Sequence, residues 1–103
     1  MPFKNNEYFQ IKGLEIDKLP SEPGVYGFSG PERSKQYPPE TWVYIACADD
    51  IRHEISARLS ADSDITTRWK PSWVSYESCP RDKMSARAGD LIRELQPMMN
   101  QLF

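Results

Sequence analysis

Two short runs of aromatic and β-branched residues, 25–28 and 42–46, constrain the fold of this chain more than any other feature. Both runs are rich in residue types that favour β-strands, and a turn-forming segment, 20–24, precedes the first. Segment 30–40 between them contains three prolines, one glycine and several charges, which is typical of a surface loop. We therefore expect the two runs to pair as a hairpin with a long connection.

Apolar spacing beyond the hairpin predicts two helices and a third strand. After Asp50, an N-cap candidate, apolar residues recur at helical spacing and predict a helix over 50–59. Residues 73–79 alternate as a strand does, and Pro80 closes this third strand. A final helix, stopped by Pro97, presents one apolar face, made of Met84, Ala88, Leu91 and Leu95.

Two weaker segments complete the order of elements. Segment 1–19 is a lead-in, in which residues 8–19 predict an extended or single-turn stretch packed against the sheet. Ile65 and Trp69 lie four residues apart and allow a short additional helix. The predicted fold is α+β, a small three-stranded antiparallel sheet flanked by helices in the order β-β-α-(α)-β-α.

Length and charge limit the classes of function. A chain of 103 residues supports one domain, 1–103, with one modest core. The formal net charge of −2 argues against a strongly electrostatic DNA binder, so any contact with nucleic acid must come from a local basic patch. The sequence shows neither an apolar run long enough to cross a bilayer nor a secretion signal, so we expect a cytoplasmic protein without a membrane partner.

The two cysteines, Cys47 and Cys79, allow one disulfide, but a small domain that depended on oxidation would usually carry more. Together with His53 they do not form a metal-ligand spacing, and a fourth ligand is not evident. We therefore expect neither a disulfide nor a zinc site.

Three motifs, in this order, resemble the GIY-YIG nuclease domain: Gly24-Val25-Tyr26, then Tyr44-Ile45-Ala46, and finally the closing Pro97 and Asn100. The resemblance covers roughly residues 19–102, and it implies the same sheet-and-helix order as the spacing above. One departure is the connection between Tyr26 and Tyr44, which is longer than the family usually has. The 30–40 loop is therefore a candidate for differences in partner choice.

The resemblance also implies where an active site would lie. Tyr26 stands for the tyrosine beside the attacking water, Tyr44 for the tyrosine on the phosphate side, and Asn100 for the closing asparagine. The family's lysine, arginine and metal-binding glutamate fall on Cys47, Glu54 and Ala88. A purely structural role also explains these residues: Ala88 as a small core residue on the apolar face of its helix, and the two tyrosines as ordinary strand residues.

Loss of these charged groups predicts loss of catalysis. Phosphodiester hydrolysis of this kind needs a metal to neutralise the phosphate and lower the pKa of water, and alanine cannot hold one. We therefore expect an inactive site without a cofactor. The alternative is an active endonuclease that holds Mg²⁺ or Mn²⁺ on a relocated carboxylate, of which Glu54 is the candidate.

Basic residues interleaved with tryptophans, Trp69 and Trp73, suggest a nucleic-acid-binding surface, because such surfaces hold phosphates and stack bases. The tryptophans are equally explained as core anchors. Our leading hypothesis is a catalytically inactive GIY-YIG-like domain that binds nucleic acid or a nucleic-acid-processing protein. The third hypothesis is a protein-interaction or inhibitor module, motivated by the near-neutral charge and the proline-rich loop. The candidate nucleic-acid-binding residues are Arg58, Arg68, Lys70 and Arg87.

Overall fold

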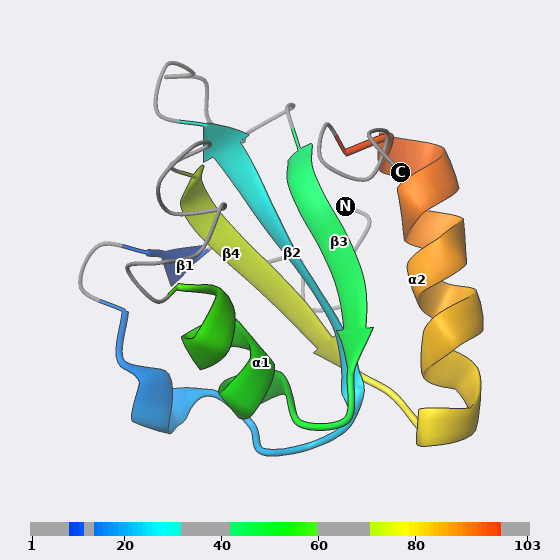
Figure 1. Ribbon diagram of the computed structural model, residues 1–103, viewed down its shortest axis with the longest axis horizontal. Helices are drawn as coiled ribbons and strands as arrows, with labels where there is room; N and C mark the ends of the chain where they lie inside the picture. Colours follow the sequence, from blue (N-terminus) through cyan, green and yellow to red (C-terminus); the bar gives the residue numbers. More distant parts are fainter. Residues whose placement is uncertain (1–8, 12–13, 32–41, 60–70, 98–103) are drawn as a thin grey trace.

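The computed structural model describes residues 9–11, 14–31, 42–59 and 71–97. Its strands form one antiparallel sheet in the order β1-β4-β2-β3 (Figure 1). The three long strands, β2 (Gly24–Pro31), β3 (Trp42–Ala48) and β4 (Pro71–Ser78), confirm the predicted three-stranded sheet and the α+β class. A two-residue strand, β1 (Phe9–Gln10), extends the sheet because the lead-in pairs with the outer side of β4.

β2 is longer than the sequence predicts. Gly30 and Pro31 were expected to belong to the surface loop, but they continue the strand, and Pro31 pairs with Pro71 of β4. Within the described residues the last pair between β2 and β3 is Ser29 with Trp42, so Pro31 is paired there only with β4, a position that can accommodate a proline. Gly30 has a φ of 66°, which glycine adopts without strain.

Gly24 at the start of β2 allows a close approach that other residues would block. A Cβ built on Gly24 would lie 2.3 Å from the Glu77 carbonyl oxygen of β4 and 2.7 Å from the Ile51 side chain. The missing side chain therefore lets the following helix pack directly on the sheet.

Two helices follow the predicted positions closely. α1 (Ile51–Arg58) follows Asp50, whose carboxylate caps the helix by accepting a hydrogen bond from the His53 backbone N–H at 3.1 Å. The same carboxylate also accepts a hydrogen bond from the Ser21 hydroxyl at 2.7 Å. These two bonds, the Ser21 bond foremost, lower the pKa of Asp50. α2 (Arg81–Leu95) ends at Gln96, which adopts the left-handed conformation typical of a helix C-terminus.

The lead-in is described over residues 9–11 and 14–19. It contains a short 3₁₀ helix, η1 (Ile16–Lys18), and Arg52 of α1 holds it by donating to the carbonyls of Leu19 at 2.8 Å and Asp17 at 3.0 Å. The predicted short helix around Ile65 and Trp69 lies outside the described residues. No helix in the described ranges is long and apolar enough to span a membrane.

The sheet separates two apolar clusters. On the α1 side, Tyr26 and Phe28 pack with α1 in a cluster that also contains Leu19, Val43, Ala48, Ile51, Ile55 and Val74. On the α2 side, Val25 and Ile45 pack with α2 in a cluster that also contains Trp42, Ala88 and Leu91. Because neighbouring side chains on a strand point to opposite faces, Val25 and Tyr26 belong to different clusters.

Candidate functional site

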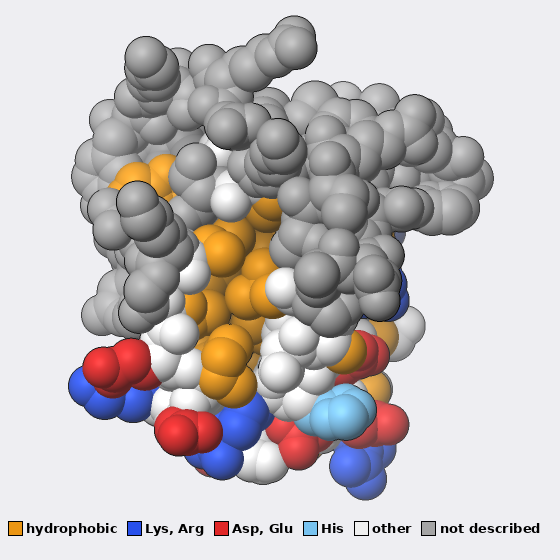
Figure 2. Space-filling view, turned by 60° about the vertical axis from the view of Figure 1, so that its left-hand side comes forward, with side chains coloured by type: hydrophobic (Ala, Val, Ile, Leu, Met, Phe, Trp, Pro, Cys, Tyr) orange, Lys and Arg blue, Asp and Glu red, His pale blue; other side chains and the backbone are white. Residues whose placement is uncertain are grey.

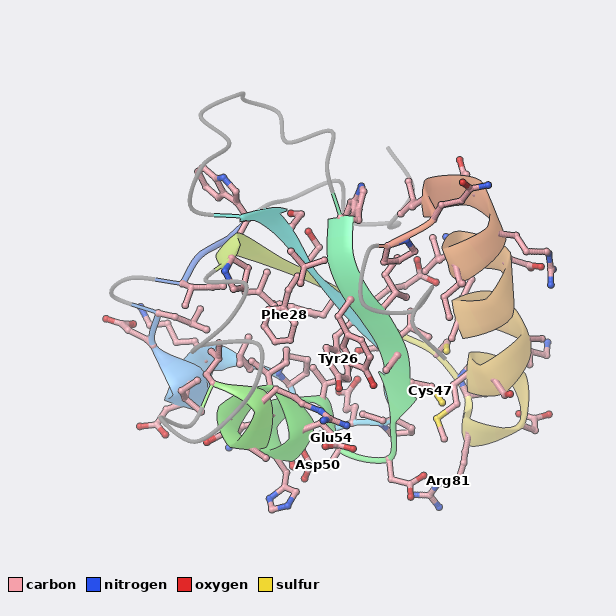
Figure 3. The ribbon with its side chains drawn as sticks, turned by 45° about the horizontal axis from the view of Figure 1, so that its top comes forward. Tyr26, Phe28, Cys47, Asp50, Glu54 and Arg81 are labelled. Carbon is pink, nitrogen blue, oxygen red and sulfur yellow. The ribbon has the colours of Figure 1, made fainter. Side chains whose placement is uncertain are left out.

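Four side chains on the α1 side of the sheet form what we call the tyrosine–arginine cluster: Tyr26, Tyr44, Glu54 and Arg58. The Tyr26 and Tyr44 rings lie 6.3 Å apart between centroids, with their planes inclined by 58°. The Arg58 guanidinium carbon lies 5.3 Å from the centroid of the Tyr44 ring, which is a cation–π contact. Figure 3 shows Tyr26 on the sheet and Glu54 on α1 on the same side, with Cys47 toward α2.

Tyr26 is fully buried at the centre of this cluster. Burial raises the pKa of Tyr26 to about 12, and the charges of Tyr44 and Glu54 act in the same direction, while contact with Arg58 offsets part of the rise. Although the Tyr26 hydroxyl lies close to Arg58, it has no well-formed hydrogen bond within the described residues. A phenol with this pKa is almost entirely protonated at neutral pH and is a poor general base.

Glu54 and Arg58 supply opposite charges one helical turn apart, and both are half-buried. Contact with the Tyr26 hydroxyl raises the pKa of Arg58, which therefore stays cationic. The Arg58 Nε is buried and has no hydrogen-bond partner in the described residues. Within the same residues, neither Glu54 nor Arg58 forms a salt bridge, so an external group can engage the Glu54 carboxylate and the terminal nitrogens of Arg58, while the Arg58 Nε stays inside the cluster.

Ala88 does not lie with the two tyrosines. It is 5% exposed on α2 and packs in the cluster that contains Val25 and Leu91, on the opposite side of the sheet. Cys47 lies on that side too, paired with Val25 across β2 and β3. The structure therefore brings Tyr26, Tyr44 and Glu54 together, as the resemblance implies, but places Ala88 and Cys47 elsewhere.

Arg87, a candidate phosphate ligand from the sequence, makes an internal ion pair instead. Its Nε and one terminal nitrogen donate to the two carboxylate oxygens of Glu77 at 2.9 and 3.1 Å. The Glu77 side chain is only 2% exposed, and this two-bonded contact with Arg87 compensates part of the cost of burying its charge. The pair joins α2 to β4, on the face opposite Arg58.

Glu77 is not among the residues predicted from the sequence, although a signal for it was present. Residues 73–79 alternate, and Glu77 occupies the same face of β4 as Ser75, which pairs with Gly27 beneath α2. A charged residue at an inward position of a strand usually has a partner, and Arg87 follows ten residues later on the predicted helix. Of the other candidate residues, Arg68, Lys70 and Asn100 lie outside the described residues, as does Trp69.

The donors present do not suit a divalent metal. Within the described ranges, no three of the His, Cys, Asp and Glu side chains come together as a metal-binding group. Glu54 is the carboxylate of the tyrosine–arginine cluster, and the Arg58 cation one turn away opposes a second positive charge beside it. Cys47 and Cys79 are free thiols.

Comparison with models of protein families finds no family that matches this chain, and a search of curated proteins finds no match.

Proposed function

We propose that this chain is a catalytically inactive, GIY-YIG-like domain that binds nucleic acid through the tyrosine–arginine cluster. The observation that carries the proposal is the guanidinium of the half-buried Arg58, held against the Tyr44 ring and joined by no salt bridge in the described residues. Arginine beside an aromatic ring is a recurrent means of binding a phosphate next to a stacked base. The contact with Tyr44 also fixes the guanidinium before a ligand arrives, which lowers the entropic cost of binding.

Two features of the cluster support binding without hydrolysis. The raised pKa of Tyr26 makes it a poor acceptor for the proton of an attacking water. Glu54 replaces an arginine in the motif resemblance, and its neighbour Arg58 disfavours a metal at that carboxylate.

The proposal is tested by fluorescence-anisotropy titration with single-stranded, duplex and branched DNA at two salt concentrations. We expect Arg58→Gln to weaken binding by about tenfold or more, because a hydrogen-bonded charge contact is lost. With single strands, the slope of log K against log salt should become shallower by about 0.7, the contribution of one phosphate contact.

The matched control is Arg93→Gln, which removes the same charge from an exposed position on α2. Equal losses in the two variants would indicate a general charge effect and contradict the proposed site. Flat curves for all the nucleic acids would reject nucleic-acid binding and leave a protein partner as the favoured explanation, which copurification from the native host would address.

The endonuclease alternative is checked separately by incubating the protein with labelled DNA or RNA and Mg²⁺ or Mn²⁺. We expect no cleavage. Cleavage that disappears in Glu54→Ala would overturn the catalytically inactive assignment.

A further inference from the structure

We propose that the tyrosine–arginine cluster is selective for guanine in single-stranded nucleic acid, with Glu54 accepting hydrogen bonds from the base while Arg58 binds the phosphate of the same nucleotide. The inference rests on the proposed function and adds base selectivity to it.

Glu54 distinguishes the tyrosine–arginine cluster from a surface that binds phosphate through cationic side chains alone. An ionised carboxylate repels the nucleic-acid backbone, so its place one turn from the phosphate-binding cation would weaken binding unless it met a hydrogen-bond donor. Within the described residues Glu54 has neither a salt bridge nor a side-chain hydrogen bond that would neutralise it. The donors that a nucleic acid offers are the N–H groups of its bases.

The chemistry of a carboxylate favours one base. Its two oxygens accept hydrogen bonds and donate none, so it pairs best with two adjacent donors. Guanine presents such a pair, N1–H and the N2 amino group, on its Watson–Crick edge. Adenine and cytosine present one amino group beside a ring nitrogen acceptor, and thymine presents one N–H between two carbonyls, so each of these places an acceptor against the carboxylate.

The Watson–Crick edge is accessible only when the base is unpaired, so the ligand is single-stranded. Glu54 and Arg58 are separated along α1 by a rise of about 6 Å, and both side chains are long enough to reach the base edge and the phosphate of one nucleotide. Tyr44, half-buried with Arg58 over its ring, borders the same site.

α1 holds Glu54 in a fixed position. Arg52, two residues before it, is bonded to the lead-in carbonyls, and Asp50 is bonded to Ser21. Ile51 and Ile55, on either side of Glu54 in sequence, are fully buried against the sheet. Figure 2 shows apolar side chains in the centre of one face, with charged ones along its lower edge.

The test compares labelled oligothymidylates that differ in one central base: guanine, hypoxanthine, adenine or cytosine. Hypoxanthine keeps N1–H and lacks the N2 amino group, so it isolates one of the two hydrogen bonds. We expect the guanine probe to bind the wild-type protein about tenfold more tightly than the adenine and cytosine probes, with hypoxanthine between them.

Glu54→Gln should remove this preference, because an amide offers a donor where the carboxylate offers its second acceptor. Glu94→Gln, the same change at an exposed position of α2, should retain it. Equal binding of all four probes by the wild-type protein would overturn guanine selectivity and leave nucleic-acid binding intact. A preference that survives Glu54→Gln would also overturn the role of Glu54, whereas no binding to any probe would reject guanine selectivity together with binding to single strands.

Discussion

Tyr26 contributes in two ways, by the packing of its ring and by the position of its hydroxyl. Its ring packs edge-on against Phe28, with centroids 5.7 Å apart, and it also contacts Tyr44. Its hydroxyl, in contrast, lacks a hydrogen bond of full geometry in the described residues and lies next to a cation. The ring therefore serves the core, while the hydroxyl contributes mainly to the electrostatics of the cluster.

Tyr26→Phe should change the pH dependence of stability more than stability at neutral pH. Because the folded pKa is about 12 and the reference value is 10.0, the unfolded chain loses this proton first as pH rises. Stability should therefore fall between about pH 10 and 12, by on the order of 3 kcal/mol if this group acts alone. Urea unfolding at pH 8 and pH 11 should show a smaller fall in Tyr26→Phe than in the wild type.

Tyr44→Phe is the control for this measurement, because Tyr44 is less buried than Tyr26 and contributes less than burial to the raised pKa of Tyr26. It should retain most of the wild-type fall. If Tyr26→Phe shows that same fall, the loss of stability at high pH comes from other groups.

At the scale of elements, α2 is fixed by an apolar stripe and a buried ion pair, and its first residue, Arg81, also pairs with Asp49 at the surface. Ala88 and Leu91 face the sheet, and Arg87 bonds to the buried Glu77 of β4. The sequence predicted the stripe and the end of the helix, because both follow from local spacing and from Pro97. It did not predict the ion pair, because that depends on which face of β4 meets α2.

Ala88→Glu should destabilise the fold by about 3 kcal/mol or more, because it places an unpaired charge in the apolar cluster between α2 and the sheet. Ala86→Glu on the exposed side of α2 should stay within about 0.5 kcal/mol of the wild type. Chemical denaturation measures both variants. A stable Ala88→Glu that binds Mn²⁺ in calorimetry would show instead that position 88 opens toward a metal site, as the motif resemblance implies.

For the whole molecule, the sheet is a partition between two unrelated surfaces. The tyrosine–arginine cluster lies on the α1 side, and Cys47, Arg87 and Ala88 lie on the α2 side. A ligand on the first surface therefore does not touch the second. The three positions inferred to have lost the family's charges could not act as one site in this arrangement.

The cysteines follow from the same geometry. Cys47 lies on β3, and Cys79 directly follows β4. The Cys79 backbone N–H donates to the Pro23 carbonyl oxygen just before β2, so β2 and the turn before it lie between the two cysteines. Two strand spacings, roughly 10 Å, exceed the reach of a disulfide. The thermal midpoint should therefore be the same with and without a reducing agent. A lower midpoint under reduction would show that the two thiols are joined.

The sequence by itself determined the three long strands, both described helices and their order, because alternation, helical spacing, an aspartate cap and prolines are local signals. It also identified Tyr26, Tyr44, Glu54 and Arg58 as separate candidates. Only the tertiary structure decided that these four lie together and that Ala88, Cys47 and Arg87 lie across the sheet, because the face a side chain occupies depends on strand register and on which helix covers it. A one-residue difference in strand position exchanges the two faces, and residue spacing alone does not fix that register.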